Sequence, residues 1–157
     1  MKRLTVWIAF VSLGLGGCGG SKQGADDPSA AGQPSEASEG TPWAKKTREQ
    51  RMDWMGLEVF PKMRAKFTEH AADKFSAFAC QTCHGSDMEA VDFKMPNSIF
   101  ALSKTDTLEK ARDYDADMTT FMLETVVPEM ATLLDTHPYD PETKSGLGCF
   151  GCHPSDD

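Results

Sequence analysis

The sequence lacks three features that would each define a class of protein: an excess of positive charge, a long apolar run and the alternating pattern of β-strands. Its 16 lysine and arginine residues are outnumbered by 24 aspartate and glutamate residues, so the formal net charge is −8. Nucleic acid is therefore a poor partner, because its phosphates attract basic proteins. The acidic surface either attracts basic protein partners or only keeps the chain soluble.

The beginning of the chain resembles an export signal. Lys2 and Arg3 precede an apolar run that ends at Leu15, and this order of charge and apolar residues is typical of secretory signals. The run is too short to span a bilayer well. Next comes "LGGC", which resembles the lipobox of bacterial lipoproteins, with Cys18 at the lipidated position. We predict a signal peptide over residues 1–17 and lipidation of Cys18; the alternative is a plain secretory signal with a stray cysteine.

Residues 18–40 contain almost only glycine, serine, alanine, proline and charged residues. This segment has no large apolar side chain to bury, so we predict a flexible tether behind the lipidated cysteine. Gly19 follows Cys18, which by resemblance to known lipoprotein sorting favours the outer membrane and a periplasm-facing protein. The composition changes at Thr41, so we predict a folded domain over residues 41–157.

The predicted domain contains an internal repeat. The segment "WMGLEVFPKMRAKFTEH" (54–70) aligns without a gap on "FMLETVVPEMATLLDTH" (121–137), at a constant offset of 67 residues. The matched pairs are Met55 and Met122, Val59 and Val126, Pro61 and Pro128, Met63 and Met130, and His70 and His137. Each segment leads through a short connector to a Cys-x-x-Cys-His sequence, so we predict two copies of one helix-turn-motif unit.

Apolar residues in both segments recur at spacings of three and four, which predicts two amphipathic helices. The pattern runs from Met52 to His70 and from Met118 to His137. The repeated prolines lie inside these stretches, where the missing N–H predicts a kink. Asp106 is predicted to cap the second helix. With long irregular connectors around the helices, the sequence predicts an all-α fold.

The two motifs are Cys80-Gln81-Thr82-Cys83-His84 and Cys149-Phe150-Gly151-Cys152-His153. Their spacing is that of c-type haem attachment. The two thiols of a Cys-x-x-Cys pair reach the two vinyl groups of one haem as thioethers, and the adjacent histidine is carried under the iron as a ligand. We therefore predict two covalently attached haem c groups with the helices packed around them.

Two other uses of the cysteines fit the sequence less well. A zinc site would draw on both pairs, but the pairs are far wider apart than zinc-finger or zinc-ribbon spacings, and each carries an additional histidine. A disulfide or a redox-active pair is compatible with export, but the chain lacks the alternation of strands and helices that is typical of thioredoxin.

The chain resembles a small dihaem c-type cytochrome lipoprotein, and its helix-turn-motif unit is similar to that of the tetrahaem cytochrome subunit of bacterial photosynthetic reaction centres. It has two such units instead of four. The resemblance implies that a methionine on the helix before each motif, Met63 or Met130, is the sixth iron ligand. Three alternatives stay open: His70 and His137 on the same predicted helical faces, and Met95 in "FKMPNS".

These features predict an electron carrier and not an enzyme. Two six-coordinate haems that exchange single electrons with redox protein partners need no catalytic acid or base. The alternative is a haem enzyme or a gas sensor with one open iron coordination position, although the sequence has no additional histidine, arginine or tyrosine cluster for a distal site. The sequence leaves open whether the carrier is free or a subunit of a larger complex.

The substitution Cys18→Ser tests the lipid anchor. Acyl chains contribute about 0.8 kcal/mol of membrane binding per buried methylene, so their loss should release the protein into the soluble fraction. Membrane fractionation of cells that express either form measures this release, with Ser21→Ala as the matched control. A Cys18→Ser protein that stays as firmly bound as the wild type would place the anchor elsewhere.

Overall fold

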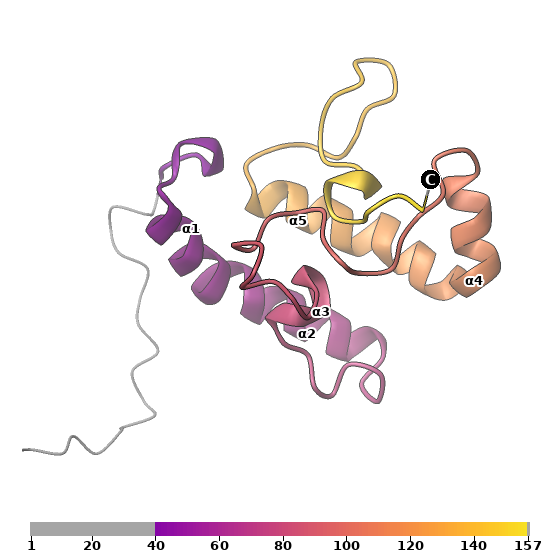
Figure 1. Cartoon of the computed structure of the whole chain (residues 1–157), viewed down its shortest axis with the longest axis horizontal. Helices are drawn as coiled ribbons and strands as arrows, with labels where there is room; N and C mark the ends of the chain where they lie inside the picture. Colours follow the sequence, from indigo (N-terminus) through magenta and orange to yellow (C-terminus); the bar gives the residue numbers. More distant parts are fainter. Residues whose placement is uncertain (1–39, 157) are drawn as a thin grey trace, which may run out of the picture. The chain divides into compact units, whose positions relative to one another are not determined.

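The computed structural model describes residues 40–156, and the predicted signal peptide, Cys18 and the tether up to residue 39 lie outside the described residues. Within residues 40–156 the chain is mostly helical and has no β-strand, which agrees with the predicted all-α fold (Figure 1). In this part of the chain, backbone pairing of the β type is limited to three isolated bridges. No helix in this part of the chain has the length and hydropathy to cross a bilayer. The short helical elements are η1 (Trp43–Lys45), α3 (Cys80–His84) and η4 (Cys149–Gly151).

A first continuous helical stretch consists of α1 (Arg48–Trp54), the π-helical turn η2 (Met55–Val59) and α2 (Phe60–His70). Thr47 begins it with a reciprocal capping box. The Thr47 hydroxyl accepts a hydrogen bond from the Gln50 N–H at 3.2 Å, and Gln50 Oε1 accepts one from the Thr47 N–H at 2.9 Å. The helix that the sequence predicts up to His70 is confirmed.

The second helical stretch consists of α4 (Thr107–Phe121), the π turn η3 (Met122–Val126) and α5 (Val127–Leu133). Its helix α4 is broken at Asp115, whose φ of −157° and ψ of 92° are not helical. Asp115 Oδ1 accepts a hydrogen bond from the Met118 N–H at 2.9 Å and so caps the part of α4 that leads into η3. Asp106 occupies the N-cap position of α4, as the sequence predicts, but its carboxylate accepts a bond from the Thr105 hydroxyl at 3.1 Å and makes no capping bond.

Each π turn ends two residues before one of the repeated prolines. In each, the N–H of the residue before the proline bonds to a carbonyl five residues back, as in the bond from Phe60 to Met55. Proline has no N–H to donate, and a turn widened by one residue accommodates this loss inside a continuous helix. The sequence predicts kinks at Pro61 and Pro128. The structure has a π turn before each proline, and the non-helical backbone inside the second stretch lies at Asp115.

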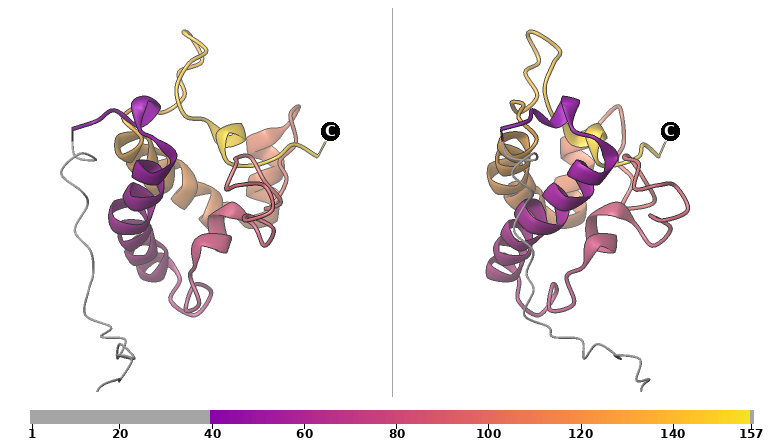
Figure 2. Two further views of the ribbon diagram at one scale, coloured as in Figure 1. Left: turned by 60° about the vertical axis from the view of Figure 1, so that its left-hand side comes forward. Right: turned by 90° about the vertical axis from the view of Figure 1, so that its left-hand side faces the viewer.

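The two helical stretches pack against each other in opposite directions (Figure 2). Trp54 Nε1 donates a hydrogen bond to the Leu133 carbonyl at 2.8 Å, which joins the first part of one stretch to the end of the other. His70 Nε2 lies 3.3 Å from Asp117 Oδ2 and joins the opposite ends. Because the pair is antiparallel, the segments that lead to the two motifs leave it from opposite ends.

The core lies between these stretches and is rich in aromatic side chains. Its buried members are Val59, Met63, Phe67, Phe78, Phe121 and Leu133. Phe67 is 3% exposed. Its ring centroid lies within 5.0 Å of those of Phe75, Phe78 and Phe121. Burying an aromatic side chain contributes roughly 1.5–3 kcal/mol, and because Phe78 directly precedes the first motif, the core also fixes where that motif begins.

The second helical stretch is shorter than the sequence predicts. It ends at Leu133, and Asp135 follows with a left-handed φ of 52°. His137 therefore lies in a loop and not on a helical face, which corrects the prediction. The loop closes on itself at Gly146, where a Cβ atom would lie 2.7 Å from the His137 carbonyl oxygen. Gly146 has a φ of 97°, which a residue with a side chain rarely adopts, so the loop depends on glycine there.

Candidate functional site

The first motif, Cys80 to His84, forms the single helical turn α3. The Ala79 N–H donates a hydrogen bond to Thr82 Oγ1 at 3.0 Å and fixes the start of this turn. At its end, Asn97 Nδ2 donates to the His84 carbonyl at 2.6 Å. A Cβ at Gly85 would lie 2.8 Å from Ser98 Oγ, so the connector lies tightly against the end of the motif.

The second motif also forms one turn, and the same connector holds it. The His153 N–H bonds to the Cys149 carbonyl at 2.9 Å and closes the turn. Leu102 N donates to the Pro154 carbonyl at 2.8 Å, and His153 Nδ1 lies 2.7 Å from the Phe100 carbonyl oxygen. A carbonyl only accepts, so Nδ1 carries the proton and His153 Nε2 keeps a lone pair, which is the usual arrangement of a metal-ligating histidine.

All four motif cysteines are free thiols. Burial raises the pKa of Cys83 to about 11, and the nearby Cys152 and Cys80 thiols add to the increase. Burial also raises the pKa of Cys152, with a smaller effect of Cys149. Hydrogen bonds of the same connector to His84, through Asn97, and to His153, through Phe100, bring the two motifs together.

His84 lies partly buried beside Phe93, with the two rings nearly perpendicular and their centroids 5.7 Å apart. Burial lowers the pKa of His84, and the backbone of Phe93 partly offsets this effect. Within the described chain, His84 Nδ1 is the one buried side-chain nitrogen or oxygen that has no hydrogen-bond partner. The lowered pKa favours the neutral imidazole, which is the form that coordinates a metal.

The predicted methionine ligands, Met63 and Met130, belong to one cluster. Met63 is 3% exposed inside the core, and Met130 is partly buried against the same core. Met95, the alternative in the connector, is also partly buried. The structure therefore brings the two repeated methionines together between the helices that precede the motifs.

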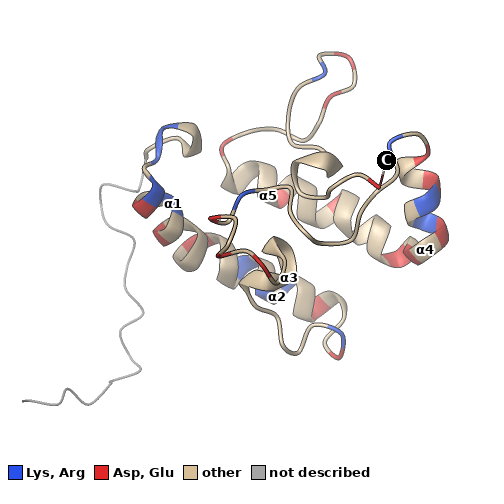
Figure 3. Cartoon of the chain, in the orientation of Figure 1, with Lys and Arg blue, Asp and Glu red and all other residues tan. Residues whose placement is uncertain are grey.

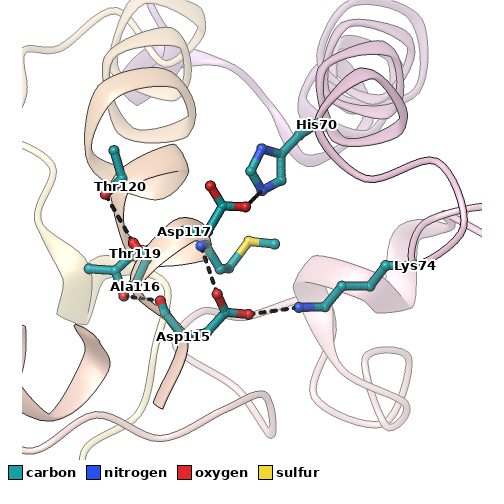
Figure 4. Close-up of polar contacts among 8 residues, drawn as sticks. His70, Lys74, Asp115, Ala116, Asp117, Thr119 and Thr120 are labelled. Carbon is teal, nitrogen blue, oxygen red and sulfur yellow. Dashed lines mark hydrogen bonds and ion pairs between the residues drawn. The ribbon is translucent and has the colours of Figure 1, made fainter. Parts of the chain in front are cut away.

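The two alternative histidines have different surroundings. The His70 ring stacks on Phe121 with the centroids 4.1 Å apart and the planes 7° apart, and its Nε2 faces Asp117 (Figure 4). His137 is exposed, and its Nε2 lies 3.1 Å from Ser145 Oγ. His70 thus already contributes to helix packing, and His137 belongs to a surface loop.

The structure adds two groups that the sequence did not indicate, the Phe100 carbonyl and the Asn97 amide. Both lie in the connector, and a backbone carbonyl leaves no signal in the sequence. Among residues 40–156, no group of three or more histidine, cysteine, aspartate or glutamate side chains could hold a metal ion by itself. No protein-family model, curated protein or solved structure matches this chain.

The raised pKa of Cys83 predicts slow alkylation in haem-free protein. At pH 8 a thiol with a pKa of about 11 is a thiolate in roughly one molecule in 1,000, against about one in four for an ordinary cysteine. Cys83 should therefore react with iodoacetamide about 200-fold more slowly than in the unfolded chain, and faster as the pH rises towards 11. Mass spectrometry of peptides measures these rates. Rapid alkylation near pH 7 in a chain that circular dichroism shows to be helical would indicate an activated thiol.

Proposed function

We propose that this protein is a membrane-tethered dihaem c-type cytochrome that transfers single electrons between redox protein partners and is not an enzyme. The observation that carries the proposal is the pair of Cys-x-x-Cys-His turns brought together by one connector. Their thiols are free, and His153 keeps Nε2 available because Nδ1 is engaged. These residues fit two covalently attached haem c groups.

The chain would supply the attachment and the iron ligands. Cys80 and Cys83 would hold one haem as thioethers, with His84 as a ligand of its iron. In the same way, Cys149, Cys152 and His153 would hold the other. When bound, each haem iron alternates between its ferric and ferrous forms and so carries one electron. The chain's own contribution is to hold the cofactors close together and to exclude water from them through the aromatic core.

Met63 and Met130 are the proposed sixth ligands. They occupy matched places after the π turns of the two helical stretches and lie in one cluster. The resemblance to the tetrahaem reaction-centre subunit supports the same residues. On this proposal, two repeated helix-turn-motif units pack around the two haems, and the connectors are long and irregular.

The proposed location is the periplasmic side of the cell envelope, at the outer membrane more than the inner one. Residues 1–17 would be removed as a signal peptide, lipid on Cys18 would anchor the chain, and residues 18–40 would form the tether. The domain over residues 41–157 would then meet protein partners near the membrane surface. Nucleic acid is not a proposed partner.

Haem attachment is tested by expressing the protein with a functional haem c maturation system. We expect mass spectrometry and a pyridine haemochrome assay to show two covalent haems in the wild type. The double substitutions Cys80→Ser/Cys83→Ser and Cys149→Ser/Cys152→Ser should each leave one haem. A wild-type protein with one haem or none would contradict the proposal.

The sixth ligands are tested by Met63→Ala and Met130→Ala. Thioether ligation favours the ferrous iron, so each substitution should lower one of the two reduction potentials and remove one methionine-to-iron charge-transfer band. Each should also allow carbon monoxide to bind at one haem.

His70→Ala and His137→Ala are the matched controls and should have little of this effect. If the histidine variants bind carbon monoxide and the methionine variants do not, the ligand assignment is wrong. If the wild type already binds carbon monoxide at one haem, the enzyme or gas-sensor function replaces the carrier.

A further inference from the structure

Two aromatic side chains stack on each other at the protein surface. The ring centroids of Phe100 and Tyr114 lie 4.5 Å apart with 30° between the planes. Phe100 is 48% exposed and Tyr114 is 72% exposed, so the pair offers an apolar surface that the rest of the described chain leaves uncovered. We call these two residues the aromatic pair.

The aromatic pair is connected directly to the second motif. The carbonyl of Phe100 accepts the hydrogen bond from His153 Nδ1 at 2.7 Å. Leu102, two residues on, bonds through its backbone to Pro154 and Asp156, which fixes the connector along the end of the chain. One ring of the pair therefore belongs to the residue that orients the proposed iron ligand.

The charge of the whole chain is acidic. Helix α4, which carries Tyr114, has four acidic and two basic side chains, and of the acidic ones Asp115 lies 3.1 Å from Lys74 and Asp117 lies 3.3 Å from His70 (Figure 3). Loss of Lys2 and Arg3 with the predicted signal peptide leaves 14 basic residues against 24 acidic ones, a formal charge of −10. This charge repels a second copy of the same chain and an anionic lipid surface, and it attracts a basic protein.

We propose that the aromatic pair is the docking surface for a basic redox protein and the place where an electron passes between that partner and the second motif. The inference rests on the proposed function and adds the site of partner binding. The partner loses one electron as this protein gains it, or the reverse, and no bond is made or broken. Exposed aromatic side chains are typical of sites that bind other proteins, and the net negative charge of the chain favours a basic partner.

The test is stopped-flow electron transfer between the haem-loaded protein and a small, strongly basic monohaem cytochrome c, used as the probe. We expect Tyr114→Ala and Phe100→Ala each to lower the second-order rate constant about tenfold at low ionic strength. Phe100→Ala keeps its backbone carbonyl, so the hydrogen bond to His153 is preserved. Tyr139→Ala is the matched control, because Tyr139 is an exposed tyrosine of the loop after α5 and is 50% exposed.

Reduction by ascorbate distinguishes a variant that has lost partner docking from one whose haems are damaged. The wild type, Tyr114→Ala and Tyr139→Ala should react with ascorbate at equal rates, because a small reductant needs no docking surface. The wild-type rate with the basic probe should fall as salt is added. Absence of covalent haem would contradict the proposed function itself, whereas the docking proposal is tested on protein that carries both haems.

Three outcomes would contradict the proposal that the aromatic pair is a docking surface for a basic redox protein. Wild-type rates in both Tyr114→Ala and Phe100→Ala would show that the partner binds elsewhere. An equal decrease of the rate constant in Tyr139→Ala would show that the effect is not local to the aromatic pair. A wild-type dimer in sedimentation analysis that Tyr114→Ala converts to a monomer would assign the pair to a second copy of this chain.

Discussion

The structure depends on the packing of a few aromatic side chains between two antiparallel helical stretches. Phe67 contacts rings from the other stretch and from the segment before the first motif, so one buried side chain links three parts of the fold. Few other side chains of the described chain are fully buried. A small domain with so little core gains stability when it buries the apolar surface of a bound cofactor, and this is consistent with the proposed haems.

The connector between the two motifs has a structural role that its irregular sequence hides. Asn97 bonds to the backbone of His84, and three residues later Phe100 bonds to the ring of His153. One short segment therefore positions both proposed iron ligands. A change of conformation in this segment would act on both motifs together, which makes the connector as important to the site as the helices are.

The sequence predicts the helix up to His70 because spacings of three and four are a local pattern. The use of the two motifs in haem attachment stays a prediction. The same periodicity was misleading after Leu133, because the left-handed conformation of Asp135 ends the helix although apolar spacing continues to His137. The π turns and the Phe100 carbonyl were not predictable, since they depend on backbone geometry and not on side-chain type.

The two copies of the repeated sequence are not equivalent in the structure. His153 has its Nδ1 bound to a carbonyl, whereas His84 Nδ1 has no partner. A hydrogen bond to the second ring nitrogen raises the basicity of a histidine ligand, and a more basic ligand favours the ferric iron. If the two motifs hold haems as proposed, His84 and His153 would therefore be unequal iron ligands, and the two irons would differ in potential. On the same proposal, an electron would have a preferred direction between the two sites.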